Sequence, residues 1–486
     1  MAEYIIETAN NKWEVVVGLE IHCQIISKSK IFSPSSTEFG DEPNTNVSFI
    51  DAGMPGMLPT LNRECVHQAV KTGLGLNAKI NNYSEFSRKN YFYADMPTNY
   101  QITQYRYPLV GEGIVTVDLS DGTSREIGIE RMHIEQDAGK SIHDLSPNKS
   151  FIDLNRAGVG LMEIVTKPDF RSPEEAGAFL RKLRSIVRYL GTCDGNMDEG
   201  SMRCDASISV RPLGEQSLRN RAEIKNVNSV KFVMQAIESE AKRQVEIYES
   251  GGTVEQQTCR FDQVSGTTKF MRKKEYADDY RYFPEPDLQP LILTDEYINK
   301  IKEEMVELPD VKKKRFVEQL GLTAYDAMVI CENKETAEFF EKAAEGHDAK
   351  KVANWMMGDF FAMLNKKRLD ITQSPVSAEN LGKLVELVSK NVISGKTAKD
   401  VFEIMAETGE NPEKIVEEKG LKQVTDTAEI EAIIDKIIAD NPENVAAYKS
   451  GKTNLCGWFV GQIMKVSQGK ANPAIVNKLI REKLDN

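Results

Sequence analysis

The chain has 486 residues, of which 40% are hydrophobic and 28% are charged, an ordinary globular composition that excludes wholesale disorder. Its 62 Lys and Arg residues against 74 Asp and Glu residues give a net charge of −12, which argues against a surface that coats nucleic acid broadly. No apolar run approaches the roughly 18 residues that cross a bilayer, and the first residues lack the apolar core of a signal peptide. We therefore expect a cytoplasmic protein without membrane spans.

The first part of the chain carries the pattern of strands. Residues 13–25 alternate strictly between apolar and polar side chains, and shorter strand signals follow at 115–119, 125–137 and 161–165. Such alternation is typical of strands with one buried face. We therefore predict an α+β fold for this part of the chain.

Helical signals follow. A helix is predicted from Ser172, a preferred N-cap residue, to Gly191. From residue 295 onward apolar residues recur at helical spacing, and Gly409 and Pro412 interrupt that pattern. The predicted domains are a mixed-sheet domain at residues 1–294, an all-helical domain at 295–407 and a small helical tail domain at 408–486.

Two SGKT segments, at 394–397 and 450–453, resemble part of a phosphate-binding P-loop. That loop also needs a glycine five residues before the glycine of GKT, and a preceding strand. Lys390 and Ala446 occupy those positions, and both contexts are helical. We interpret both segments as turns that connect helices.

Acids and imidazoles share the polar faces of two predicted strands. Glu20 and His22 lie on one face of the first strand, and His133, Glu135 and Asp137 lie on one face of another. Side chains spaced in this way can ligate a metal or hold a network for proton transfer. For the first strand taken alone, a solvated outer face is the commoner explanation.

Glu163 is the strongest single indication of a site. It lies inside the apolar run LMEIV, where an ionised carboxylate is costly unless it is paired or binds a cation. With Glu20, Glu135 and His22 it would form a cluster, mostly of oxygen ligands, suited to Mg²⁺ and the phosphates of a substrate. Because imidazole is an unusual ligand for Mg²⁺, Mn²⁺ is an alternative.

Three further polar segments stand out, and two of them allow two interpretations. Residues 88–104 mix cations with aromatic side chains, which suits stacking on a base or a tyrosine-rich surface loop. Residues 198–211 place Arg203 and Asp205 on one face of a strand. The proline-rich residues 278–287 fit a structural corner as well as a binding loop.

Together, and in this order, these segments resemble one known family. The motifs are VGLEIHCQ, FSRKNYFYADMPTNYQITQY, HIEQDAGKSIH, DLNRAGVGLMEIVTKPD, GNMDEGSMRCDASISVR, EIKNVNS and DYRYFPEPDL. They resemble the B subunit of the aspartyl/glutamyl-tRNA amidotransferases. The helical remainder, which ends in GKTNLCGWFVGQIMKVSQGKANP, resembles the tRNA-binding tail of that family.

This resemblance implies a cradle-shaped, kinase-like first domain and a heterotrimer with a glutaminase (amidase) partner and a small third partner, the A and C subunits. The B subunit would use ATP to phosphorylate the side-chain carboxylate of Glu or Asp on mischarged Glu-tRNA(Gln) or Asp-tRNA(Asn). Ammonia from the glutaminase would then replace the phosphate, giving Gln-tRNA(Gln) or Asn-tRNA(Asn). The resemblance thus implies a ligase that forms a carbon–nitrogen bond.

The resemblance also implies site residues. The implied metal ligands are Glu20, His22, Glu135 and Glu163. Glu135 and Lys89 match catalytic positions associated with the path of ammonia. The positions that resemble the nucleotide and substrate pocket are Asn90, Ser201, Arg203 and Asp205. The tail lysines that would face the tRNA backbone are Lys449, Lys452, Lys465 and Lys470.

Some family members carry a zinc site with paired cysteines where this chain has residues 46–56. Because that segment contains no cysteine, and because the seven cysteines include no C-x-x-C pair, we predict no zinc. Two other classes of function stay open. One is a non-catalytic scaffold that docks tRNA, and the other is a metal-dependent kinase or ligase for small molecules.

Overall fold

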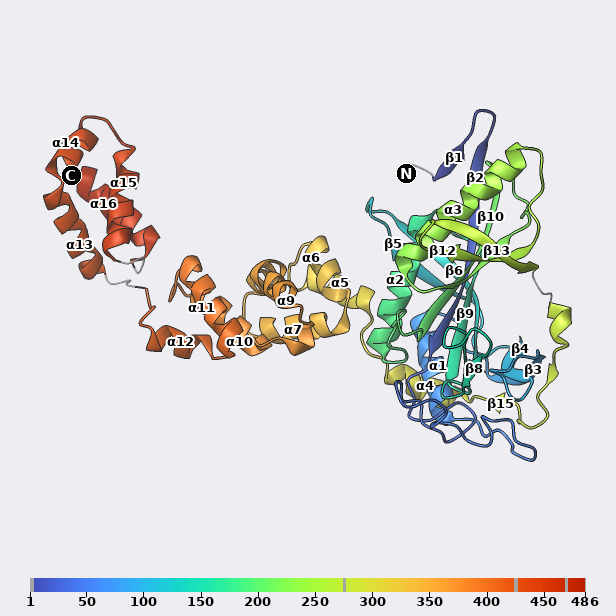
Figure 1. Cartoon of the computed structure of the whole chain (residues 1–486). Helices are drawn as coiled ribbons and strands as arrows, with labels where there is room; N and C mark the ends of the chain where they lie inside the picture. The colour runs from blue at the N-terminus through green and yellow to red at the C-terminus, as the bar shows by residue number, and fades with distance from the viewer. Residues whose placement is uncertain (1–3, 274–276, 424–426, 468–470, 486) are drawn as a thin grey trace. The chain divides into compact units, whose positions relative to one another are not determined.

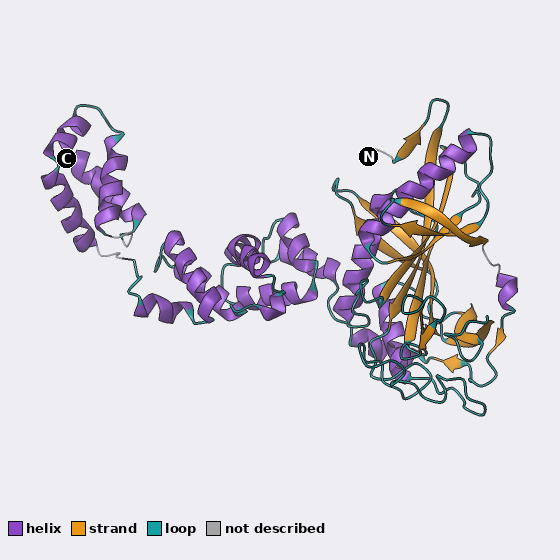
Figure 2. Ribbon diagram, in the orientation of Figure 1, coloured by secondary structure: helices purple, strands orange, loops and turns teal. Residues whose placement is uncertain are grey.

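The chain divides into two units, Met1–Pro309 and Asp310–Asn486, in the computed structural model (Figure 1). The structure describes residues 4–273, 277–423, 427–467 and 471–485. The first unit mixes strands and helices, and the described residues of the second are helical (Figure 2). This confirms the α+β class with a helical C-terminal region, whereas the domain boundaries at 294/295 and 407/408 stay predictions.

One mixed sheet organises the first unit. Within the described residues it has nine strands in the order β13-β12-β11-β10-β2-β9-β6-β5, with β1 paired to β2. The bounds are β1 Ile5–Glu7, β2 Lys12–Gln24, β5 Gly113–Asp118, β6 Ser124–Gln136, β9 Gly160–Thr166, β10 Met202–Pro212, β11 Ala222–Val227, β12 Gln257–Asp262 and β13 Thr267–Lys273. β11 and β12 pair in parallel, and the other neighbours pair antiparallel.

The apolar face of this sheet forms the core. On β2 the alternate residues Val15, Val17, Leu19, Ile21 and Cys23 are at most 2% exposed, which confirms the predicted alternation. These side chains belong to one hydrophobic core, to which three long helices contribute most of the helical residues. The helices are α1 Arg63–Gly75, α2 Pro173–Leu190 and α3 Val230–Glu249. The opposite face, called the open face below, is therefore left to polar side chains.

α2 begins and ends as predicted. The hydroxyl of Ser172 accepts a hydrogen bond from the backbone N–H of Glu175. Gly191 ends the helix at φ 69°, a left-handed conformation that glycine adopts without steric cost. The apolar residues between these caps are buried, so the sequence alone predicted this helix correctly.

A second, smaller sheet lies against one end of the open face. Its strands are β3 Tyr83–Asn90, β4 Tyr100–Tyr107, β14 Phe283–Pro284 and β15 Leu291–Ile292. Gln104 on β4 accepts a hydrogen bond from the backbone N–H of Ile134 on β6, at 3.1 Å. β7 Lys140–Ile142 and β8 Phe151–Asp153 form a separate hairpin. The small sheet thus covers part of the open face and leaves β2 and β10 beside a cavity.

The segment 278–287 forms a tied corner. Glu285, only 3% exposed, accepts two hydrogen bonds from the Arg88 guanidinium, at 2.7 and 2.8 Å. The Asn90 amide donates to the carbonyl groups of Tyr280 and Arg281, at 3.0 and 2.9 Å. These contacts hold Tyr280 in a short 3₁₀ turn, Ala277–Tyr280, beside the strands of the site.

The second unit is built from helices in its described residues. After α4 Asp295–Glu303 in the first unit come α5 Pro309–Glu318, α6 Ala324–Cys331, α7 Lys334–Ala344, α8 Ala349–Trp355, α9 Phe361–Lys367, α10 Ala378–Ser389, α11 Gly395–Thr408, α12 Pro412–Glu418, α13 Thr427–Asp440, α14 Pro442–Lys449, α15 Leu455–Val466 and α16 Pro473–Asp485. Ser394 caps α11 and Ser450 follows α14. The segment at 450–453 is therefore a turn between helices, as predicted, whereas the segment at 394–397 is the N-cap and first turn of α11, so the prediction of a connecting turn is wrong there. In the described ranges, no helix has the length and apolar character needed to cross a membrane.

A buried ion pair stabilises the loop of residues 46–56, the segment for which we predict no zinc. Lys30 and Asp51 are 0% and 3% exposed at their side chains, and Nζ lies 3.2 Å from Oδ2. Asp51 also accepts from the hydroxyl of Ser33 and the backbone N–H of Ser48, both at 2.8 Å. Lys30 donates to the carbonyl of Asn46 at 2.6 Å. A fully partnered pair of this kind fixes the loop, because neither charge can be left alone in the interior.

We expect Lys30→Met to destabilise the first unit by about 3–5 kcal/mol, because it strands the buried Asp51 carboxylate. Urea unfolding of the full chain, followed by a signal from the first unit, measures this change. Lys28→Met is the matched control, since Lys28 is exposed and should change the free energy of unfolding by less than about 0.5 kcal/mol. Equal effects of the two substitutions would contradict a structural part for the pair.

Candidate functional site

Strand register brings the predicted ligands together. His22 on β2 lies directly opposite Glu163 on β9, and Glu163 lies directly opposite His133 on β6. These three residues form one row across adjacent strands, on the open face. Glu20 and Glu135 lie two residues away along their strands and so point to the same face. Residues distant in the sequence thereby form one cluster.

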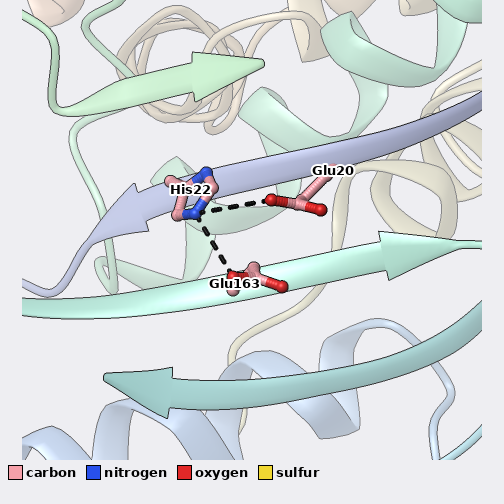
Figure 3. Close-up of side chains that lie close together, drawn as sticks. All are labelled: Glu20, His22 and Glu163. Atoms are coloured by element: carbon pink, nitrogen blue, oxygen red, sulfur yellow. Dashed lines mark ion pairs between the residues drawn. The ribbon is translucent and has the colours of Figure 1, made fainter. Parts of the chain in front are cut away.

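His22 stands at the centre of this cluster (Figure 3). Its Nε2 lies 3.4 Å from Glu163 Oε2, 3.7 Å from Glu135 Oε1 and 3.9 Å from Glu20 Oε1. All four predicted metal ligands therefore meet around one nitrogen atom.

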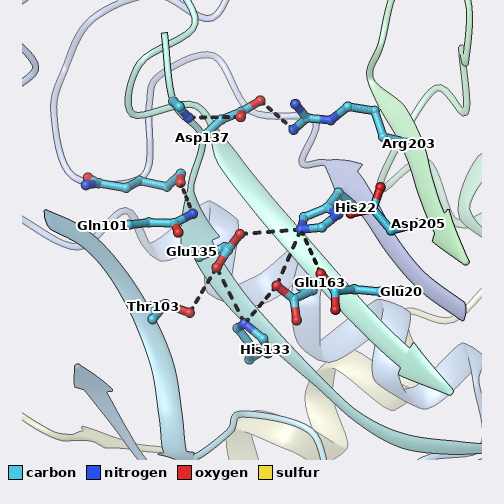
Figure 4. Close-up of polar contacts among 12 residues, drawn as sticks. Glu20, His22, Gln101, Thr103, His133, Glu135, Asp137, Glu163, Arg203 and Asp205 are labelled. Atoms are coloured by element: carbon cyan, nitrogen blue, oxygen red, sulfur yellow. Dashed lines mark hydrogen bonds and ion pairs between the residues drawn. The ribbon is translucent and has the colours of Figure 1, made fainter. Parts of the chain in front are cut away.

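His133 joins the cluster from the far side (Figure 4). Its Nε2 lies 3.5 Å from Glu135 Oε2 and 3.6 Å from Glu163 Oε2. The hydroxyl of Thr103 on β4 donates to the same Glu135 oxygen at 2.9 Å. The sequence prediction did not include His133 among the ligands, although the alternation had placed it on the right face.

The cluster concentrates negative charge in a buried place. Burial alone would lower the pKa of His22, but the carboxylates of Glu163, Glu20 and Glu135 raise it to about 9. The charge of Glu163, together with burial, raises the pKa of Glu20 to about 7. Burial would raise the pKa of Glu163, but His133 and His22 hold it well below its usual range. The site thus favours a positive charge at its centre.

The donor set fits a divalent cation. Ligand atoms of Glu20, His22 and Glu163 lie within 4.8 Å of one another, as do those of His133, Glu135 and Glu163. Carboxylate oxygens suit Mg²⁺ and Mn²⁺, and the imidazole nitrogen is better matched to Mn²⁺ than to Mg²⁺. These residues can therefore hold either ion.

A cavity of about 280 Å³ opens beside the cluster, and the predicted residues Lys89, Arg203 and Asp205 line it. Arg203 Nη2 lies 2.8 Å from Asp137 Oδ2, and Asp205 Oδ2 lies 3.0 Å from Lys225 Nζ. Burial would lower the pKa of Lys89, but Glu135 holds it above its usual range, so the ammonium group keeps its charge.

An adjoining cavity of about 290 Å³ shares Glu20, Lys89 and Glu135 with the first. Four further basic residues line it: Arg131, Arg221, Lys225 and Arg272. Because these cations surround a carboxylate cluster, the site offers partners both for a metal and for phosphate oxygens. The sequence analysis assigned none of these four residues to the site. Arg131 alternates with His133 and Glu135 on β6, and this spacing could have indicated that it lies on the same face.

Two predicted pocket residues lie elsewhere. Ser201 donates to Asp194 in the turn before β10 and does not line either cavity, and Asn90 is held by the tied corner. Their part in nucleotide binding stays a prediction. In the second unit Lys449, Lys452 and Lys465 are exposed, whereas Lys470 lies outside the described residues.

We expect Mn²⁺ to bind this cluster, and Glu163→Gln to weaken that binding about tenfold or more, since Glu163 contributes to both ligand groups. Electron paramagnetic resonance of free Mn²⁺, titrated with the full chain, measures the affinity. Glu130→Gln is the matched control, because Glu130 is an exposed carboxylate on the same strand as Glu135. Equal affinities of the two variants would contradict the assignment.

Comparison with known proteins identifies the family of the chain. A family model described as GatB/GatE catalytic domain matches residues 15–299, and one described as GatB domain matches residues 338–484. Proteins named as the B subunit of aspartyl/glutamyl-tRNA(Asn/Gln) amidotransferase are similar over 481 residues, 99% of this chain and 99% of theirs. Identity is 62% for Rhodospirillum rubrum, 61% for Paramagnetospirillum magneticum and 56% for Rickettsia rickettsii. The chain therefore belongs to the family of aspartyl/glutamyl-tRNA amidotransferase B subunits, as its motifs predicted.

Proposed function

We propose that this chain is the component of a tRNA-dependent amidotransferase that activates and amidates Glu or Asp on a mischarged tRNA. The observation that carries the proposal is the ring of carboxylates and imidazoles facing cavities lined with Lys and Arg. The 62% identity with a protein named for this activity supports it over both alternatives, a docking scaffold and a small-molecule kinase.

The chemistry explains why such a site is needed. A carboxylate is a poor electrophile, because its oxygen leaves badly. Transfer of the γ-phosphoryl group of ATP to that oxygen gives an acyl phosphate, and ammonia then displaces phosphate to form the amide. Phosphoryl transfer requires positioned charge more than covalent help from the protein.

Each part of the cluster has a task in this proposal. A Mg²⁺ or Mn²⁺ ion held by Glu20, His22, Glu135 and Glu163 would neutralise charge on the phosphates. Lys89, which stays charged beside Glu135, would bind an anionic oxygen of the activated carboxylate. Arg203 and Asp205, which line a cavity, would hold the nucleotide and the aminoacyl group. Asn90 and Ser201, which line neither cavity, would act only through the corner and the turn that they hold.

The proposal extends to the assembly. The first unit would form the cradle-shaped, kinase-like domain, and the predicted domains at 295–407 and 408–486 would guide tRNA. A glutaminase partner would supply ammonia and a small third partner would join the two, in the cytoplasm where tRNA is charged.

An amidation assay tests this function. We expect the chain with its partner subunits to convert Glu-tRNA(Gln) to Gln-tRNA(Gln) with Mg-ATP and ammonium chloride, and only when ATP is present. Ammonium salt bypasses the glutaminase, so the assay isolates the proposed step. We expect Glu163→Gln to lower the rate about 100-fold or more while tRNA affinity is kept, and Glu130→Gln to leave the rate unchanged.

Tight binding of tRNA without any glutamine product would contradict the enzymatic proposal and favour the docking scaffold. ATP cleavage that ignores tRNA would instead favour the small-molecule kinase.

The tail lysines give a second test. Because each lysine that neutralises a phosphate releases counterions, Lys449→Gln, Lys452→Gln and Lys465→Gln together should weaken tRNA binding and lower its salt slope by about 2 to 3. Filter binding at several salt concentrations measures both quantities. An equal exchange of the exposed Lys28, Lys79 and Lys149 in the first unit is the control. A slope that stays the same in the tail variant would exclude the tail from the phosphate contacts.

A further inference from the structure

Glu135 presents its two carboxylate oxygens to different neighbours (Figure 4). Oε1 lies 3.7 Å from Nε2 of His22, the nitrogen around which the predicted metal ligands meet. Oε2 lies 3.5 Å from Nε2 of His133 and accepts a hydrogen bond of 2.9 Å from the hydroxyl of Thr103. One oxygen is thus held from the small sheet, and the other faces the centre of the cluster.

The rotamer preferences of Glu135 do not fix this orientation by themselves. The last torsion of a glutamate side chain is broad, so the carboxylate plane turns easily unless another group holds it. The two imidazoles lie 3.5 and 3.7 Å away, which is longer than an ordinary hydrogen bond. The Thr103 hydroxyl, at 2.9 Å, makes the shorter and more directional contact.

Thr103 is well suited to hold a carboxylate. It is only 3% exposed, so water competes little for its hydroxyl. A hydroxyl has a single proton to donate, and here the proton goes to a carboxylate, which makes the hydrogen bond a strong one. Because threonine is branched at Cβ, its χ1 torsion is restricted, and the donor is therefore itself held in place.

Two neighbouring side chains of β4 bond instead to the backbone of β6. Gln101 donates to the carbonyl of Gln136 at 2.7 Å, and Gln104 accepts from the N–H of Ile134 at 3.1 Å. These bonds attach the small sheet to the large one whatever residue stands at position 103. Loss of the Thr103 hydroxyl should therefore leave the sheets attached and change the orientation of one side chain in the cluster.

We propose that Thr103 is a positioning residue, which holds one oxygen of Glu135 so that the other faces the site of a divalent cation. The proposal rests on the proposed function, which assigns Glu135 to the metal. Without the hydroxyl, the carboxylate would be free to turn toward the charged ammonium group of Lys89. Loss of a hydrogen bond that orients a metal ligand typically weakens metal binding by roughly 10- to 100-fold.

Thr103→Val tests the proposal, because valine keeps the branched shape and removes the hydroxyl. Electron paramagnetic resonance of free Mn²⁺, titrated with the full chain, measures the affinity. We expect Thr103→Val to weaken Mn²⁺ binding about tenfold or more, and Thr103→Ser, which keeps a hydroxyl, to stay within about twofold of the unaltered chain. Unchanged affinity in Thr103→Val overturns the proposal, and so does an equal loss in Thr103→Ser.

Gln101→Met is the control for loosening of the small sheet, since it removes a bond from β4 to the backbone of β6. We expect it to lower the urea midpoint of unfolding and to leave Mn²⁺ affinity unchanged. If it weakens Mn²⁺ binding as much as Thr103→Val does, attachment of the sheet is responsible rather than the orientation of Glu135, and the proposal is overturned.

A double variant shows whether Thr103 acts through Glu135. In a chain that already carries Glu135→Ala, Thr103→Val should change Mn²⁺ affinity by less than about twofold, because no carboxylate is left to hold. A further loss of about tenfold in that chain overturns the proposal. Where Thr103→Val fails to fold, Thr103→Cys, whose thiol is a weak donor, decides by the same criteria. Because binding is measured rather than turnover, a chain that binds Mn²⁺ but fails the amidation assay contradicts the proposed function and still tests Thr103.

Discussion

In-register pairing of β2, β9 and β6 is the constraint on which the rest of the site depends. It sets His22, Glu163 and His133 in one row, because residues directly opposite each other point to the same face. A slip of one residue in β9 would turn Glu163 into the apolar core and bring Met162 or Ile164 to the open face. The hydrophobic core therefore excludes the slips of one residue that would remove Glu163 from the open face.

The cluster is destabilising for the fold because it buries several carboxylates together, and this explains why imidazoles and cations lie beside it. Carboxylates in a buried place repel one another, so Glu163 depends on the imidazoles beside it and on the charge of Lys89 to stay ionised. Without a metal ion, His22 supplies positive charge at the centre of the cluster, since its pKa is raised to about 9. A divalent cation would replace this charge with a larger one at the same point. A bound metal would therefore relieve a repulsion among these carboxylates.

Local rules predicted much of this structure. The alternation in β2 and the caps of α2 follow from neighbouring residues, and so does the unusual carboxylate of Glu163 within an apolar run. Which strands lie side by side does not follow from local rules, because it depends on contacts between distant segments. For that reason the sequence analysis placed His133 on the correct face but not in the cluster. It included Lys225 in a family motif but assigned it no role. The residues alone grouped Glu20, His22, Glu135 and Glu163 as a possible metal cluster, and the family resemblance implied the same four ligands.

Neither SGKT segment is a P-loop, so the phosphates of a nucleotide would have to be bound by other groups. Where a helix N-terminus does not hold the phosphates, cations must come from side chains spread over several strands. β10 provides a row of polar groups, since Arg203, Asp205, Ser207, Ser209 and Arg211 alternate with the apolar residues of the core face. Strands lie about 4.8 Å apart and side chains on one face repeat about every 6.6 Å, so a sheet face can line up groups over the length of a nucleotide. An extended polar face of this kind suits a reaction that must align a nucleotide, an aminoacyl ester and ammonia at one carboxyl carbon.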